Sequence, residues 1–438
     1  MQDNHVSNNI PILLSSLVLI SYFLGFYLDE NSAGSGADTA ELGDLLNTWN
    51  NLELFLSNSI MDGVNATSSL DQTVYKSSRT PLVYIFHKIF NPFTDSIDSF
   101  RKSVFFFSLL GPIIFFLCLK QRFRSTKDSY LILISSLILL SPYFRTSAFW
   151  GNEENFGIIS ALLSYLFLQL FLNESRYHFR RIFLLTLTII VSSITVYFDH
   201  KLLLIPTICY FYILIAKDSL SIKIFSTLIY IFCSIPFIYL IYIWDNIIPT
   251  GDASLRVGKL HFTHIGYAVT IISFYLLPLI FFFKDFSQNS LLKFFEKKIN
   301  INLLLLPIVY IIIHIIFFDL HQDPGIGKGY MFKLSNMIFG SSIYQKIFIY
   351  FSFIITWAIF IFAFQKKIIN ILISSYFLIF PIFTWPLLQE YFDPLIFILA
   401  FTFFKFDLKI NHNNSIFIFC YMGLFLVVCN FYYNNLLN

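Results

Sequence analysis

The sequence predicts an all-α polytopic membrane protein, a bundle of about thirteen transmembrane helices with a long first external loop that carries amphipathic helices. Three observations support this fold class. The 438 residues are 57% hydrophobic and only 13% charged, whereas soluble chains carry about 25% charged residues. Apolar runs of membrane-spanning length recur along the chain, and Lys and Arg gather in alternate connections between them. We therefore expect one transmembrane domain over residues 1–438.

The first apolar run, 10–28, is expected to be an uncleaved span rather than a signal peptide. Residues 1–9 contain no Lys or Arg, and no small-residue cleavage pattern follows the run. The spans need about 20 apolar residues, or fewer where a helix is shielded by protein. They are predicted near 10–28, 103–119, 129–143, 156–172, 182–197, 202–216, 224–243, 265–283, 301–318, 346–364, 368–384, 392–404 and 415–433.

The orientation follows from the distribution of charge between the loops. One set of alternate loops holds 17 of the 29 basic residues but only 7 of the 26 acids, which is typical of cytoplasmic loops. The opposite set is then periplasmic or lumenal, and it comprises 29–102, 144–155, 198–201, 244–264, 319–345 and 385–391. All sharp candidates for chemistry lie on that non-cytoplasmic side.

Composition also excludes several classes of partner. The net charge of +3 and the lack of a long basic run argue against nucleic acid. All five Cys lie in apolar segments, without CxxC or Cys/His ligand spacing, so no metal residues are assigned.

The first external loop, 29–102, is predicted to contain two membrane-surface helices. Leucines and Trp49 recur at spacings of three and four residues between 42 and 56, with acids between them, which indicates an amphipathic helix. Residues 57–80 look irregular. Thr80-Pro81 starts a second short helix, since Pro suits a first turn, and Asn91-Pro92 ends it.

Two adjacent acids, Asp29 and Glu30, follow the first span directly. Ionisable groups near lipid are costly unless they have a function. Neighbouring residues on a helix do not share a face, so we expect one acid to act on a substrate and the other to orient or cap. Asp29 is favoured as a general base. The alternative is that both acids only cap the next segment or mark the water interface.

Two short external loops add further candidates. Arg145 with Glu153 and Glu154 would supply an anion contact and a second carboxylate, or it is merely a solvated ion pair of little energetic value. Asp199-His200-Lys201 lies in a very short connection, so its charges must reach water, a partner or a ligand. Lys201 would then contact a phosphate, and the alternative is interface anchoring.

The 244–264 loop concentrates cationic side chains, namely Arg256, Lys259, His261 and His264. Arg and Lys are the usual binders of phosphate oxygens, and a plain aqueous loop is the alternative. The two His lack an acid at a matching position for a metal site. Later polar groups are ascribed to flexible or solvated loops, because the Gly-rich run near 325–329 lacks P-loop spacing; they are His321, Asp323, Lys328, Lys333, Gln389 and Glu390.

This pattern resembles the GT-C superfamily of integral membrane glycosyltransferases, which use a polyprenyl-phosphate-linked sugar as donor. The resemblance rests on Tyr27-Leu28-Asp29-Glu30, on the long first loop with its Pro-led second helix at Arg79-Thr80-Pro81, and on the acids of the second external loop. The stretch from Gly251-Asp252 to Tyr267, with His261 and His264, is loosely similar to the dolichyl-phosphate-glucose and dolichyl-phosphate-mannose transferases.

The resemblance implies an inverting hexosyltransferase. For this multi-pass protein we expect the bacterial inner membrane rather than the endoplasmic reticulum. Its partners would be the lipid donor, a lipid-linked or surface-glycan acceptor, and membrane lipid. Catalysis would fall to Asp29, Glu30, Glu153 and Glu154, and donor-phosphate binding to Arg256, Lys201, Arg145, Lys259, His261 and His264. No cofactor is certain, and a divalent ion remains open. A polysaccharide polymerase or ligase and a lipid-linked oligosaccharide flippase remain the alternatives, although nearly uncharged spans argue against a transport path.

Overall fold

The structure is a computed structural model that describes residues 3–33, 38–71, 73–216, 218–251, 260–262, 264–283, 312, 329–340, 343–364 and 367–433. Within these ranges the regular structure is helical apart from isolated β-bridges, such as the one between Phe283 and Leu408. The predicted all-α membrane class is confirmed. The chain divides into two compact units, Met1–Leu255 with Met422–Asn438, and Arg256–Tyr421, which we describe separately.

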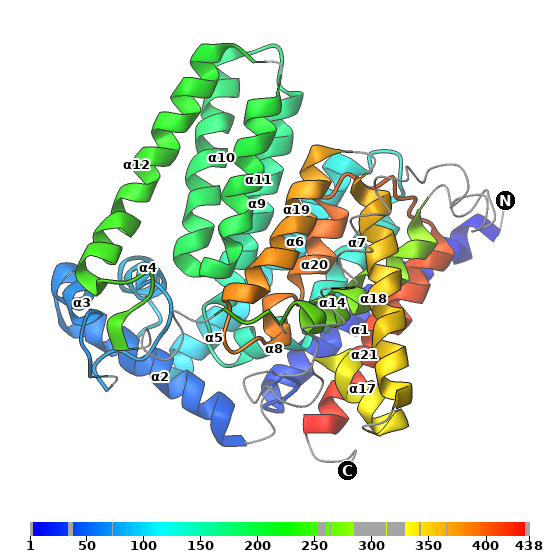
Figure 1. The fold of residues 1–438 in the computed structure, drawn as a ribbon, viewed down its shortest axis with the longest axis horizontal. Coiled ribbons are helices and arrows are strands. Elements are labelled where there is room, and N and C mark those ends of the chain that lie inside the picture. The colour runs from blue at the N-terminus through cyan, green and yellow to red at the C-terminus, as the bar shows by residue number, and fades with distance from the viewer. Residues whose placement is uncertain are drawn as a thin grey trace. The chain divides into compact units, whose positions relative to one another are not determined.

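Unit 1 contains the first long helix, the first loop and a group of long apolar helices (Figure 1). Its elements are α1 (Asp3–Tyr27), α2 (Asp38–Ser57), α3 (Ile60–Ala66), α4 (Leu82–Phe90), α5 (Ile97–Ser108), α6 (Leu110–Arg122), α7 (Asp128–Ser136), η1 (Leu137–Leu140), α8 (Pro142–Phe149), α9 (Glu154–Asn173), α10 (His178–Phe198), η2 (His200–Leu203), α11 (Leu204–Ile215) and α12 (Leu220–Trp244).

Unit 2 is built around α14, whose residues from His264 to Leu276 are all buried. Helices α17, α18, α19 and α20 pack against it. The elements are α14 (His264–Leu276), η3 (Leu277–Phe282), α17 (Tyr330–Phe339), α18 (Ile343–Phe364), α19 (Ile368–Ile379), η4 (Phe380–Phe383), η5 (Gln389–Tyr391) and α20 (Leu395–Phe401); α21 (His412–Tyr433) starts in unit 2 and ends in unit 1.

The described residues include seven helices long and apolar enough to cross a membrane, so the predicted count of thirteen is not confirmed. The pair Asp128–Leu140 and Pro142–Phe149, bent by 66°, would make an eighth. The predicted run 392–404 has only the seven helical residues Leu395–Phe401, and 301–318 lies outside the described residues. An apolar run alone does not distinguish a span from a short buried helix.

The first loop folds into a cap, defined as α2, α3 and α4, which packs on the ends of four helices. Its buried residues form one hydrophobic cluster with side chains at the start of α5 and α9 and at the end of α10 and α12. Leu52 and Phe55 of α2 are completely buried there. Trp244 at the end of α12 donates a hydrogen bond to Thr67 Oγ1 over 2.7 Å.

Helices α2 and α4 occur where the sequence predicts helices, with Pro81 as the N-cap residue of α4. Helix α3 lies in the stretch predicted to be irregular. Its start is set by Ser59, whose hydroxyl accepts a hydrogen bond from the Asp62 amide. A single polar N-cap of this kind stabilises the first turn of a helix. It produces no apolar periodicity in the sequence, so the sequence did not predict α3.

The cap also buries His87, which lies edge-on to Phe100 and Phe156 at ring distances of 4.8 and 5.1 Å. Asn91 Nδ2 donates to His87 Nδ1 over 2.9 Å, which fixes a neutral ring with its proton on Nε2. Burial lowers the pKa of His87 to about 3.

The His87 pKa predicts how the stability of the cap depends on pH. An unfolded His binds a proton below its ordinary pKa of about 6.5, while folded His87 does so only near pH 3. Stability should therefore fall as the pH drops below about 6.5, because the unfolded chain binds more protons. We expect the thermal midpoint of purified protein to fall between pH 7.5 and 5, and His87→Gln to reduce that slope; an unchanged slope would contradict it.

Candidate active site

A bent segment, 141–155, positions three of the predicted site residues in unit 1, Arg145, Glu153 and Glu154. Ser141 Oγ accepts from the Phe144 amide over 3.0 Å and starts α8. The turn after α8 passes through Gly151, whose φ of 74° suits glycine. Asn155 Nδ2 then donates to the Phe144 carbonyl over 2.9 Å. This closed segment presents Arg145 to one charged cluster and Glu153 and Glu154 to another.

Asp29 is the most exposed of the predicted acids. Its side chain is 63% exposed, and its Oδ1 accepts from an Arg101 guanidinium nitrogen over 2.5 Å. Arg101 lies over the rings of Phe26 and Trp150, at 4.8 and 4.5 Å from their centroids, and its Nε donates to the Phe149 carbonyl. These contacts fix the guanidinium, so Arg101 offers Asp29 a preorganised partner while leaving most of the carboxylate open to water.

Asp29 is placed by an unusual backbone at the end of α1. Its φ is 52°, a left-handed conformation that is uncommon outside glycine. The Glu30 amide donates to the Gly25 carbonyl over 2.9 Å, and the Asp29 amide donates to the Phe26 carbonyl over 3.4 Å. This pair of bonds is a Schellman C-cap, in which the left-handed position normally holds Gly. An Asp here is a local cost to the fold and favours a role for its side chain.

Glu30 turns away from Asp29 into a buried ion pair. Arg145, only 1% exposed, donates to Glu30 through Nε over 2.8 Å and through a terminal nitrogen. Its other donors bond to Ser21 and to the Leu139 carbonyl. Asn430 adds a bond to Glu30 Oε1 over 3.2 Å. With its five N–H groups engaged, Arg145 is placed as a structural residue rather than as an open anion contact.

Gly25 leaves the space that this ion pair occupies. A Cβ at Gly25 would overlap an Arg145 nitrogen and a Glu30 oxygen, and it would lie 2.9 Å from Phe149. Arg145 and Glu30 can therefore lie this close to α1 only because residue 25 is a glycine.

We predict opposite effects for two Gly→Ala substitutions in helices. Gly423 in α21 has nothing within 4 Å of a built Cβ, so Gly423→Ala should stabilise by up to about 1 kcal/mol through helix propensity. Gly25→Ala should instead destabilise by about 1–3 kcal/mol, as overpacking does. Thermal unfolding of the two variants in the same detergent tests the sign, and stabilisation by Gly25→Ala would contradict the close approach.

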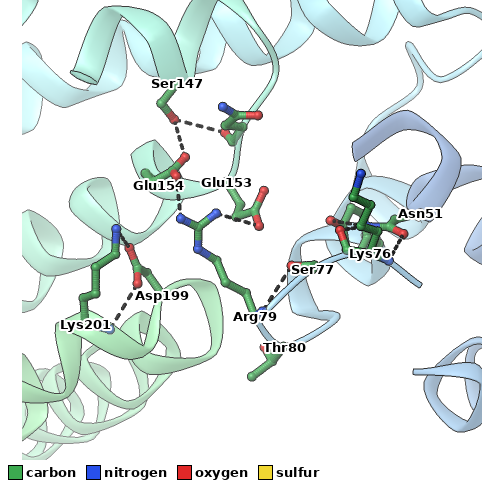
Figure 2. A network of polar contacts seen from close by, with 12 residues as sticks. Asn51, Lys76, Ser77, Arg79, Thr80, Ser147, Glu153, Glu154, Asp199 and Lys201 are labelled. Atoms are coloured by element: carbon green, nitrogen blue, oxygen red, sulfur yellow. Dashed lines mark hydrogen bonds and ion pairs between the residues drawn. The ribbon is translucent and has the colours of Figure 1, made fainter. Parts of the chain in front are cut away.

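The second cluster joins Glu153 and Glu154 to Arg79, which precedes α4 (Figure 2). One Arg79 nitrogen lies 2.9 Å from Glu153 Oε1, and the other lies 2.5 Å from Glu154 Oε1. Ser147 Oγ donates to Glu154 Oε2 over 3.1 Å. We call Arg79, Glu153, Glu154, Asp199 and Lys201 the Arg79 cluster.

Lys201 and Asp199 form the other edge of the Arg79 cluster. Their side chains lie 3.2 Å apart, and the Lys201 amide donates to Asp199 Oδ1 over 3.1 Å. The five side chains together carry one net negative charge. The pKa of the Asp44 carboxyl in α2 is raised, mainly by desolvation. The negative charges of the nearby Glu154 and Glu153 raise this pKa further, although the Asp44 side chain reaches solvent. The cluster as a whole therefore favours hydroxyl or cationic groups over a phosphate.

The remaining sequence candidates fall in unit 2 or outside the described residues. His261 and His264 stack with ring centroids 4.6 Å apart, and His264 Nδ1 bonds to the Thr384 carbonyl over 2.7 Å. Gln389 Nε2 donates to the Tyr275 hydroxyl over 2.9 Å. Arg256, Lys259, His321, Asp323 and Lys328 lie outside the described residues.

Of the three arginines that meet the predicted acids, Arg79 and Arg101 were not among the predicted site residues. Arg101 pairs with Asp29 across 72 positions, and Arg79 pairs with Glu154 across 75. The only sign in the sequence was opposite charge: both arginines lie in the loop 29–102, on the same predicted side of the membrane as the acids. Neither pairing has a sequence period that would specify it.

Among the described residues, no group of three or more His, Cys, Asp or Glu side chains could hold a metal ion. Comparison with known proteins found no family model, no curated protein and no solved structure that matches the chain. The class that the described residues define is accordingly a multi-pass, all-α membrane protein with clusters of charged side chains at helix ends in unit 1.

Proposed function

We propose that the protein is a membrane hexosyltransferase that moves a sugar from a polyprenyl-phosphate donor to a hydroxyl acceptor. The observation that carries this proposal is Asp29, an exposed carboxylate at the end of the first span, held in a left-handed turn and paired with a fixed Arg101. Such a carboxylate suits a general base, which must reach the proton of a substrate hydroxyl.

In the proposed reaction an Asp29 carboxylate oxygen takes the proton of the acceptor hydroxyl. The acceptor oxygen forms a bond to the anomeric carbon of the sugar. The bond from that carbon to the phosphate oxygen breaks, and its electron pair leaves with the polyprenyl phosphate. Direct displacement inverts the anomeric configuration. The products are the glycoside and the polyprenyl phosphate, with the proton on Asp29.

Direct displacement at the anomeric carbon gives the cationic side chains two different roles. Nucleophile and leaving group lie on opposite faces of the anomeric carbon, so Arg101, in contact with Asp29, suits orientation of the base rather than binding of the leaving phosphate. The phosphate needs positive charge where it departs. Arg256, Lys259, His261 and His264, which share one predicted loop, remain our phosphate-binding proposals on residue type. Arg145 is assigned a structural role, and Lys201 pairs with Asp199 in the Arg79 cluster, whose net negative charge disfavours a phosphate.

Glu153 and Glu154 are proposed to bind acceptor hydroxyls. Carboxylates accept hydrogen bonds from hydroxyl groups, and the net negative Arg79 cluster favours such a neutral polyol over an anion. The site is proposed to face the periplasm or lumen, since Asp29 and Glu154 belong to the loops poor in Lys and Arg. A bacterial inner membrane is the favoured location.

The test is transfer by purified protein in lipid nanodiscs, supplied with polyprenyl-phosphate-[¹⁴C]glucose or the mannose equivalent and a delipidated glycan extract. We expect release of free polyprenyl phosphate that depends on the extract. Movement of an intact lipid-linked oligosaccharide across proteoliposomes without cleavage would instead support a flippase. Repeating the assay with EDTA decides whether a divalent ion takes part.

A further inference from the structure

We propose that Gly25, Glu30 and Arg145 form a positioning lock that sets the direction of the Asp29 carboxylate. The role of Asp29 rests on the proposed function, but the lock itself is a property of the fold. The lock has three parts: a shared backbone turn, a fixed anchor after that turn, and a space that only glycine leaves open.

The backbone turn couples the two acids. Asp29 and Glu30 share a peptide group, and the bond from the Glu30 amide to the Gly25 carbonyl closes the turn. With φ at 52°, the Asp29 side chain leaves the helix on the Arg101 side. A displacement of the Glu30 backbone is passed to Asp29 as a rotation of this peptide plane, because the peptide group is rigid and only the φ and ψ dihedrals on either side of it are soft.

The anchor is Glu30, which contacts three residues that are distant in the chain. Arg145 of α8 binds both carboxylate oxygens, and Asn430 of α21 binds one of them. Trp150 Nε1 donates to the Glu30 carbonyl over 3.3 Å, and the same indole ring lies beside the Arg101 guanidinium. Trp150 therefore connects the Glu30 pair to the Asp29 pair.

The third part is Gly25, which has no side chain and so leaves room for Arg145 and Glu30 beside α1. A methyl group here would push both charged groups away from α1. The direction of Asp29 would change without any alteration of Asp29, Arg101 or the Arg79 cluster. Gly25, Glu30 and Arg145 are accordingly positioning residues that do not touch substrate.

Chemical modification of Asp29 tests the lock without a substrate. A water-soluble carbodiimide with glycine ethyl ester modifies exposed carboxyls, and peptide mass spectrometry gives the rate at each site. In the wild-type protein the Asp29 side chain is open to the reagent, but its ion pair with Arg101 engages Oδ1 and should slow the modification. We expect Glu30→Gln, which keeps size and removes charge, and Gly25→Ala to raise the Asp29 rate severalfold, as Arg101→Gln does directly.

The controls separate redirection of Asp29 from general unfolding. Asp71, exposed in the cap, should react at the wild-type rate in folded variants, and Gly423→Ala should leave the Asp29 rate unchanged. Unchanged Asp29 rates in both Glu30→Gln and Gly25→Ala, with a raised rate in Arg101→Gln, would overturn the lock. If Gly25→Ala fails to fold, the isosteric Glu30→Gln still decides the question.

An activity measurement then separates this inference from the proposed function. If the wild-type protein transfers glucose from the polyprenyl-phosphate donor, Glu30→Gln should lower kcat severalfold with little change in KM for the donor, because a misdirected base affects the chemical step. Loss through KM alone would count against the lock. No transfer by the wild-type protein would overturn the proposed function and leave the modification result standing.

Discussion

Asp29→Asn is expected to reduce sugar transfer by about 100- to 10,000-fold, the range that general-base catalysis contributes. Asn keeps the shape of Asp, and its amide oxygen can still accept a hydrogen bond from Arg101. It cannot take a proton from an attacking hydroxyl. The loss should therefore appear in kcat, measured as polyprenyl phosphate released at saturating donor, with the folded yield unchanged.

Asp62→Asn is the matched control for Asp29→Asn. Asp62 is an exposed acid in α3 whose carboxylate bonds to the neighbouring Ser59 hydroxyl, so its loss should leave transfer intact. Full activity of Asp29→Asn would remove Asp29 as the base. Glu153 and Glu154 would then be the remaining predicted acids to test for that role.

Glu30→Ala should give the largest loss of stability, about 3–5 kcal/mol, because it leaves a buried arginine without its counterion. Arg145 is 1% exposed and its pair with Glu30 lies in the interior of unit 1. Equilibrium or thermal unfolding in one detergent measures the effect. Adding Arg145→Met should recover much of it, since apolar residues of similar volume can replace a buried ion pair.

Asp128→Ala provides the comparison for an exposed pair. Lys120 and Asp128 lie 2.8 Å apart with about half of each side chain in solvent, 53% and 54%. Its loss should cost less than about 1 kcal/mol. Equal effects for Glu30→Ala and Asp128→Ala would show that burial does not set the strength of the Glu30 pair.

Local chemistry predicted part of this arrangement. Adjacent residues diverge on a helix, so the different roles of Asp29 and Glu30 were expected, and the structure places them with different arginines. Helices α2 and α4 of the cap followed from apolar spacing and from Pro81, whereas α3 did not. The position of Arg145 did not follow: a loop arginine was expected to be open to anions, yet the 66° bend before α8 turns it into the protein.

Long-range pairing and helix length account for what the sequence could not predict. Arg79 and Arg101 meet their acids only because the cap, α5 and α8 fold together. The predicted run 392–404 shows the limit of hydropathy: Thr402 ends α20 after seven helical residues. Burial in protein and contact with lipid both favour apolar side chains, so composition alone does not separate them.

The separation of paired charges along the chain has a consequence for biogenesis. The partner of Glu30, Arg145, is synthesised 115 residues after it, and Glu154 is synthesised 75 residues after its partner Arg79. During translation these groups must stay in water or with insertion factors, because unpaired charges enter a bilayer at high cost. A nascent chain arrested before residue 145 lacks the cationic partner of Glu30. A chain arrested beyond residue 201 contains both charges of the Glu30–Arg145 pair and every member of the Arg79 cluster.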